Sequence, residues 1–153
     1  MTAALVKVAD DVTAALNGQT FVPSFTAVRS YADDEMELTE PGALRVDVVV
    51  VGHDEAELSS RGVVRFQSGI DIGVRFKFGK DEQGSDGKID KAEIDKLVEL
   101  SESIYLFLAR QRLDLAVWQD AAFRSSYVRK HLREWRQFTC IIRVRFDTHH
   151  QLP

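Results

Sequence analysis

The sequence predicts an α+β fold: an antiparallel (mixed) β-sheet of four to five strands with two α-helices packed on one face. Two segments repeat apolar residues at helical spacing, and several others alternate apolar and polar residues with the period of a strand. The order of these segments is a helix, three strands, a helix and one or two strands, which suits two helices covering one face of a sheet. With 153 residues, 44% of them hydrophobic, the chain is expected to form a single domain over residues 1–153.

The first half begins with an amphipathic helix. Apolar residues recur at helical spacing over Leu5–Leu16. Thr2 can cap the start of this helix, and Gly18 follows its end, where a left-handed residue is favoured. An extended strand is expected over Phe25–Tyr31, followed by an acidic loop over Asp33–Glu37.

Strict alternation predicts the next two strands. Leu44–Val51 places Val46, Val48 and Val50 on one side and Arg45 and Asp47 on the other. Gly52–Gly62 is polar and is expected to be a loop. Val63–Phe78 alternates again, with a bulge or bend expected near Gly69. One face of this strand is apolar and the other polar, as is common in antiparallel sheets.

The second half holds the second helix and the last strands. A loop over Gly79–Lys88 precedes a helix over Lys91–Gln111, which has a clear apolar stripe. A short strand is expected over Ser126–Val128, and Trp135–Phe146 alternates as a long strand. Residues 147–153 are expected to form a loose C-terminal tail.

Charge is unevenly distributed along the chain. Residues 1–60 contain three basic and eleven acidic residues, a net charge of −8, whereas residues 110–145 contain nine basic and three acidic residues, a net charge of +6. Such a chain can complement itself across a subunit interface, although an ordinary mixed surface has the same composition. The candidate interface residues are Asp33, Asp34, Glu35, Arg124, Arg129, Lys130 and Arg133.

Composition argues against a membrane protein and a disulfide scaffold. No apolar run reaches the roughly 18 residues that a membrane span needs. Met1–Lys7 lacks the pattern of a signal peptide, so we expect synthesis in the cytoplasm. Cys140, the single cysteine, lies in an apolar strand pattern and is expected to be a buried structural thiol.

One segment has the spacing of a calcium-binding loop. Glu82–Glu93 resembles an EF-hand loop, but its first position is Glu82 rather than Asp, its third is Gly84, and a strand precedes it instead of a helix. We prefer a helix start in which Asp90 is the N-cap and Glu93 its reciprocal partner. A calcium-binding module remains an alternative.

Two other segments suggest chemistry. Phe123–Arg136 mixes basic and aromatic residues, as nucleic-acid surfaces do, but a protein contact or a solvated face accounts for the same composition. His53, Asp54, Glu55 and Glu57 could support acid–base chemistry, although acidic surface loops are far commoner than active sites. The sequence contains neither a phosphate-binding glycine loop nor a Cys/His metal spacing. We therefore expect no enzyme activity, catalytic residue, cofactor or metal.

The chain as a whole resembles the tail terminator or tail-completion (neck) proteins of long-tailed bacteriophages and prophages. The resemblance covers about residues 5–146 and depends on the order of short segments. These segments are Val8-Ala9-Asp10, Ala14-Ala15-Leu16-Asn17, Phe25-Thr26-Ala27-Val28-Arg29, Leu44-Arg45-Val46, Ile70-Asp71-Ile72-Gly73-Val74, the helix from Asp90, and Arg136-Gln137-Phe138-Thr139.

This resemblance implies a structural role in the virion, with synthesis in the bacterial host cytoplasm. A tail terminator forms a ring, here expected to be a hexamer, that caps the tail tube and stops its polymerisation. The implied partners are further copies of the chain, the tail tube protein and a head-completion or connector protein, while DNA only passes through the lumen. The alternative in the same setting is a head-side connector or stopper ring.

Overall fold

The computed structural model describes residues 3–31, 35–59, 61–110 and 117–152. Within them the chain has an α+β fold with three α-helices, a short 3-10 helix and five strands, which confirms the predicted class. The helices are α1 (Ala4–Gly18), α2 (Lys91–Leu108) and α3 (Arg129–Trp135), with the 3-10 helix η1 at Lys80–Glu82. The strands are β1 (Ala27–Ser30), β2 (Leu44–Ser59), β3 (Val63–Lys77), β4 (Val117–Ser125) and β5 (Gln137–Gln151).

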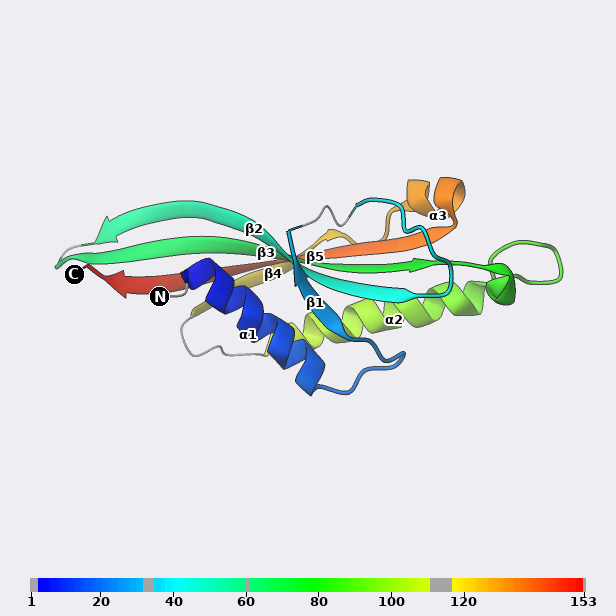
Figure 1. Ribbon diagram of the computed structural model, residues 1–153, viewed down its shortest axis with the longest axis horizontal. Coiled ribbons are helices and arrows are strands. Elements are labelled where there is room, and N and C mark those ends of the chain that lie inside the picture. Colours follow the sequence, from blue (N-terminus) through cyan, green and yellow to red (C-terminus); the bar gives the residue numbers. More distant parts are fainter. Residues whose placement is uncertain (1–2, 32–34, 60, 111–116, 153) are drawn as a thin grey trace.

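The five strands form one mixed sheet in the order β1-β2-β3-β5-β4. The short strand β1 runs parallel to β2, and every other neighbouring pair is antiparallel. The strand β3 lies at the centre and pairs with β5 without interruption from Val63↔Gln151 to Lys77↔Gln137. These long strands make the molecule elongated (Figure 1).

Helices α1 and α2 cover the same face of the sheet (Figure 1). The residues of β3 and β5 that face them alternate with polar ones, as the sequence predicts. The core on this side is built from Val8, Val12 and Leu16 of α1, Leu97, Leu100 and Ile104 of α2, and Ile70, Ile72, Val74, Cys140, Ile142 and Val144 of the sheet. Burial of this apolar surface is the main force that holds the two helices on the sheet.

A third helix lies on the opposite face, which corrects the prediction of two helices on one face. The seven residues of α3 run above β5 (Figure 1), and Nδ1 of His131 lies 2.9 Å from Oγ1 of Thr139, an outward-facing residue of β5. The segment Ser126–Val128, predicted as a strand, connects β4 to α3 instead. A helix of two turns has too short a periodic pattern to be recognised in the sequence.

The strand β2 is longer than predicted. It continues to Ser59 through the segment Gly52–Gly62, which was expected to be a loop, because β3 supplies backbone partners as far as Val63. The pairing of β2 with β3 is irregular between Val50 and Gly52 and between His53 and Glu55. The first irregularity lies opposite Ile70 and Gly69, which confirms a bulge near Gly69, with the extra residue in β2. The polar composition of residues 52–59 predicts a loop, but hydrogen bonds to β3 stabilise this segment as a strand.

Both ends of the chain also differ from the prediction. Residues 147–151, expected to be a loose tail, belong to β5, and the backbone N–H of Leu152 donates to the carbonyl of Gly62 at 2.7 Å. The helix α1 begins after Ala3, whose side chain makes no capping hydrogen bond, and Thr2 lies outside the described residues.

The outward face of the sheet buries charged side chains as ion pairs. Asp47 of β2 and Arg75 of β3, 5% and 7% exposed, are joined at 2.6 Å. Asp71 of β3 is equally buried and binds two guanidinium groups, those of Arg143 in β5 and Arg124 in β4. Removing one partner of a buried pair leaves the other charge uncompensated, so these pairs are strict requirements of the fold.

We predict that Asp47→Ala lowers the free energy of unfolding by about 3–5 kcal/mol, because it leaves the buried Arg75 guanidinium without its carboxylate. The control is Glu37→Ala, which breaks the exposed pair between Glu37 and Lys77 and should cost under about 1 kcal/mol. Urea unfolding followed by circular dichroism measures both. Equal losses in the two variants would contradict this account.

Candidate functional site

The segment 35–38 lies against the outward face of the sheet and is fixed there by polar contacts; we call it the strap. The backbone N–H of Leu38 donates to Oε1 of Gln137 at 2.7 Å, and the carbonyl of Met36 accepts from Arg75 at 3.1 Å and from Gln137 at 3.2 Å. Nζ of Lys77 binds Glu37 at 2.6 Å. The strap thus covers side chains of β3 and β5.

The strap brings two of the predicted interface residues together within one subunit. Glu35 forms an ion pair with Arg124, whose guanidinium also lies 3.3 Å from the carboxylate of Asp71. These two residues therefore complement each other inside the chain, and their role at a subunit interface stays a prediction. Asp33 and Asp34, the other acidic candidates, lie outside the described residues.

The three remaining candidates lie together on α3. Arg129, Lys130 and Arg133 are exposed, and none of them pairs with a carboxylate in the described part of the chain. They face solvent because the other side of this helix is occupied by the stack of His131 on Trp135, whose ring centroids are 4.1 Å apart. The helix therefore presents three basic side chains on the outward face.

Burial changes the pKa of His131. Desolvation lowers the pKa of its imidazole below the usual 6.5, while the charge of Glu35 acts in the opposite direction. The neutral ring is thus the form that fits between Trp135 and Thr139.

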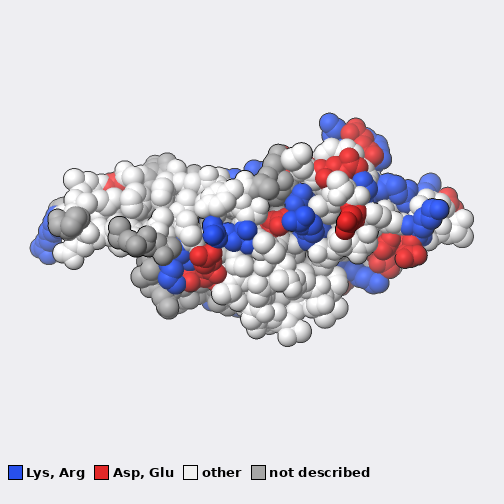
Figure 2. Space-filling model, in the orientation of Figure 1, with Lys and Arg blue, Asp and Glu red and all other residues white. Residues whose placement is uncertain are grey.

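An acidic stripe lies on α2, on the other side of the sheet. Asp95, Glu99 and Glu102 are exposed and follow one another at spacings of four and three residues, which places them on one side of the helix. The spacing of these residues is visible in the sequence, but only the structure shows that this side of the helix is exposed. Figure 2 shows that charged side chains gather over one half of the molecule in that view.

The loop that resembles an EF-hand is built as a helix start. Oδ1 of Asp90 accepts from the backbone N–H of Ala92 at 3.1 Å, as predicted for an N-cap. The reciprocal role of Glu93 is wrong, because its carboxylate binds Lys96 at 3.0 Å and the N–H of Asp90 donates to the carbonyl of Glu82. The carboxylate of Glu82 accepts from the N–H of Gly79 at 2.8 Å. Both end residues of the presumed loop are thus engaged elsewhere.

The proposed acid–base group lies in β2 rather than in a surface loop. Nδ1 of His53 is 2.8 Å from Oγ of Ser68, and its ring stacks on Phe66 with centroids 4.6 Å apart. Glu57 lies 3.7 Å from Arg65 on the neighbouring strand. These contacts assign both side chains to cross-strand packing. Asp54 and Glu55 also lie in β2, but their side chains lie outside the described part of the structure.

Three further expectations concern the cysteine, a metal site and a membrane span. Cys140 is buried as predicted, and burial raises the pKa of its thiol to about 11. Among the described residues, no group of three or more His, Cys, Asp or Glu side chains is placed to hold a metal ion. None of the helices in these residues is both long and apolar enough to span a membrane.

No protein-family model matches the chain, and no curated protein matches it.

We predict that His131→Gln flattens the acid side of the stability profile. Because the pKa of His131 is lowered in the fold, the unfolded chain binds the proton more readily, and stability is lost as the pH falls below about 6.5. Between about pH 7.5 and 5.5, unmodified protein should therefore lose more unfolding free energy than the variant. Urea unfolding at several pH values measures this difference. His149→Gln, a change at an exposed position, is the control, and a variant profile parallel to that of unmodified protein would exclude the mechanism.

Proposed function

We propose that the protein is a structural virion component, a phage tail terminator whose ring, of about six subunits, caps the tail tube and joins tail to head. The ordered resemblance over residues 5–146 suggests this role. The observation that carries the assembly part of the proposal is that three exposed basic side chains gather on α3 and three exposed acidic ones on α2. The basic helix α3 lies on one side and the acidic stripe of α2 on the other.

Opposite charges on opposite faces favour a contact between unlike surfaces of two copies. A contact of this kind uses a different surface on each copy, and it closes into a ring when the rotation between copies is suitable. Basic Arg129, Lys130 and Arg133 of one copy would meet acidic Asp95, Glu99 and Glu102 of the next. In this contact the acidic surface is that of α2 and not the acidic loop Asp33–Glu37. Glu35 of that loop already pairs with Arg124 within the same chain.

The same ring could belong to the head side, as a connector or stopper. The two roles share the subunit contact and differ in what the ring binds, the tail tube or the portal. The structure disfavours the calcium-binding alternative. Calcium needs several free oxygen ligands, whereas the carboxylates of Glu82 and Asp90 already accept backbone hydrogen bonds. The terminator role is thus the proposal, with the connector as its alternative.

Reversing charge on α3 should dissociate the ring and leave the subunit folded. In Arg129→Glu/Arg133→Glu, like charges replace the attraction, so the subunit dissociation constant should rise at least about tenfold, a change of 1.4 kcal/mol. Analytical ultracentrifugation at low and high salt measures it, because screening weakens contacts between exposed charges. Adding Glu99→Arg/Glu102→Arg should restore association.

The matched control is Lys80→Glu/Lys88→Glu, which alters net charge equally at exposed positions away from α3. Loss of association in this control, or failure of the compensating pair, would argue against the charge contact.

Deleting the gene from its phage tests the role itself. A missing terminator leaves tube polymerisation unchecked, so the expected products are filled heads together with overlong or unjoined tails. Electron microscopy of the lysate measures tail length and attachment. Tails of normal length that lack heads would favour the connector role instead, and normal virions would refute both roles.

A further inference from the structure

A chain of hydrogen bonds joins the strap to α3 on the outward face of the sheet. The backbone N–H of Leu38 donates to Oε1 of Gln137 at 2.7 Å, and Nε2 of Gln137 lies 3.0 Å from Oγ1 of Thr139. This Oγ1 lies 2.9 Å from Nδ1 of His131. Gln137 and Thr139 are fully buried, and His131 is 8% exposed. The chain therefore connects the strap with α3 through groups that are almost entirely shielded from water.

The strap fixes the orientation of the Gln137 amide. A backbone N–H can only donate, and a backbone carbonyl can only accept. Leu38 supplies the N–H, and Met36 supplies a carbonyl 3.2 Å from Nε2, so Oε1 of Gln137 is the acceptor and Nε2 the donor. Because Nε2 carries two hydrogens, it donates both to Met36 and to Oγ1 of Thr139. This Oγ1 is therefore an acceptor toward Gln137.

The tautomer of His131 follows from this orientation. The hydroxyl of Thr139 has one hydrogen to donate. Within the described residues, its hydrogen-bond partners are Gln137, which donates to it, and Nδ1 of His131. The hydroxyl thus donates to Nδ1, which must be the nitrogen without a hydrogen. The neutral ring then carries its hydrogen on Nε2.

A proton on Nδ1 of His131 is incompatible with this arrangement. Nδ1 would become a donor, and Oγ1 of Thr139 would have to accept from both His131 and Gln137. The hydrogen of the hydroxyl would then lack an acceptor in a fully buried site, which costs free energy. The charged ring would also lose hydration that it has in the open protein. Protonation therefore works against the closed position of the strap and α3.

The charges on neighbouring elements are already paired. Glu35 of the strap attracts a charged imidazole at position 131, but it forms an ion pair with Arg124 of β4. Arg75 of β3 lies opposite Thr139 in the strand register and is paired with Asp47 of β2. Neither ion pair offers the imidazolium a carboxylate of its own.

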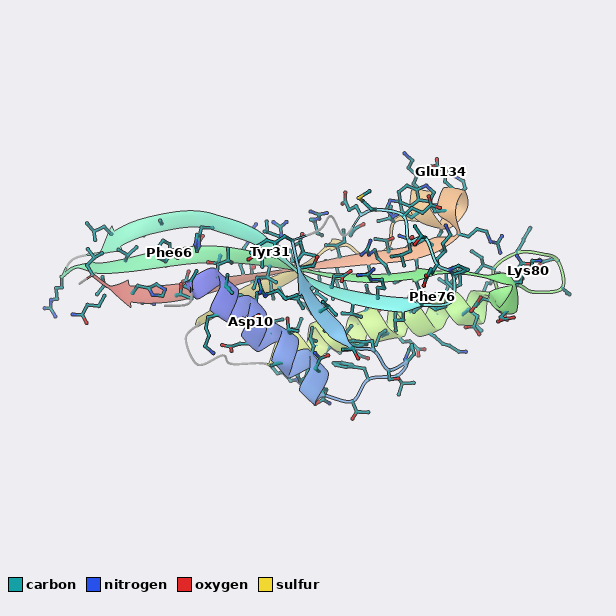
Figure 3. The ribbon with its side chains drawn as sticks, in the orientation of Figure 1. Asp10, Tyr31, Phe66, Phe76, Lys80 and Glu134 are labelled. Atoms are coloured by element: carbon teal, nitrogen blue, oxygen red, sulfur yellow. The ribbon has the colours of Figure 1, made fainter. Side chains whose placement is uncertain are left out.

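The charges on α3 itself act in opposite directions. Lys130 disfavours a charged imidazole, whereas Glu134 favours it from an exposed position on α3 (Figure 3). Burial is the largest influence, and it lowers the pKa of His131 below the usual 6.5. The ring in the closed protein is thus neutral above that value and takes up a proton as the pH falls.

We propose that Leu38, Gln137, Thr139 and His131 form a latch that acid opens. A proton taken up from solvent by Nδ1 of His131 reverses its hydrogen bond with Thr139, and the strap and α3 then leave the sheet together. The main core lies on the other face of the sheet, so this opening does not require α1 and α2 to unfold. The latch is a property of the single subunit and does not depend on the proposed ring.

Amide hydrogen exchange, followed for single residues by NMR, tests the latch. The amide of Leu38 reports on the strap, and the amide of Arg136, which donates to the carbonyl of His131, reports on α3. Between about pH 7.5 and 5.5 the protection of both should fall in parallel by up to about tenfold, the limit set by the usual pKa of 6.5 for the open ring. Protection that does not change with pH at these two amides overturns the latch.

The amide of Ile104, a fully buried residue of α2, measures global unfolding. Leu38 and Arg136 should be less protected than Ile104 at every pH, because the strap and α3 open locally. Protection equal to that of Ile104 would mean that these amides exchange only when the whole protein unfolds, and it overturns the local opening.

Two variants at position 139 separate the hydrogen bond from packing. Thr139→Val keeps the branched shape without the hydroxyl, so the protection of Leu38 should no longer depend on pH, while that of Arg136 still does. Thr139→Ser keeps the hydroxyl and should behave as the unmodified protein. A merely structural role of Thr139 would lower protection by the same factor at every pH, and a contact between copies would affect both variants alike. Equal pH dependence of Leu38 in the two variants overturns the coupling.

The ring of His131 supplies the last two checks. His131→Gln has no titrating ring and should remove the pH dependence at both Leu38 and Arg136; its persistence would assign the effect to another group. In the unmodified protein at about pH 7.5, the nitrogen chemical shifts of the ring should show Nε2 with a hydrogen and Nδ1 without one. A hydrogen on Nδ1 of the neutral ring overturns the direction of the hydrogen-bond chain and the latch with it.

Discussion

Burial of charge on the outward face of the sheet is the constraint on which the rest of the structure depends. The central strand β3 buries apolar residues toward α1 and α2, but its alternate positions bury Asp71 and Arg75. A buried charge is tolerated only with a partner, and here β2, β4 and β5 supply those partners as Asp47, Arg124 and Arg143. The ion pairs therefore tie four strands together in one register, because a slip of one residue would move every charge into the apolar core.

The same charges organise what covers this face. Arg75 donates to the carbonyl of Met36 and Arg124 pairs with Glu35, so the strap is fixed by side chains that the sheet already needs. Next to it, Thr139 and Trp135 hold the buried ring of His131, which orients α3. The exposed basic residues of α3 are thus displayed by a small helix whose inner side is specified by the sheet. A short helix placed in this way can be rigid without a large core of its own.

Residues 52–59, 63–68 and 146–151 show how a long sheet can extend beyond its helices. Three strands with an ion-paired outward face give enough cross-strand interaction to keep this part of the sheet in register. The two irregularities in β2 lie along an edge that β1 does not cover, where bulges discourage uncontrolled pairing with other chains.

The sequence by itself determined the α+β class, the two long helices and the alternating centres of β2, β3 and β5, because local periodicity reflects which side chains are buried. It also indicated the Asp90 cap, since a cap depends on neighbours two or three residues away. Only the tertiary structure decided that the polar segment 52–59 and residues 147–151 are strands, since both obtain their backbone partners from β3. It also decided that Glu35 pairs with Arg124, 89 residues away. Such contacts depend on how distant segments are brought together, and no local pattern records that.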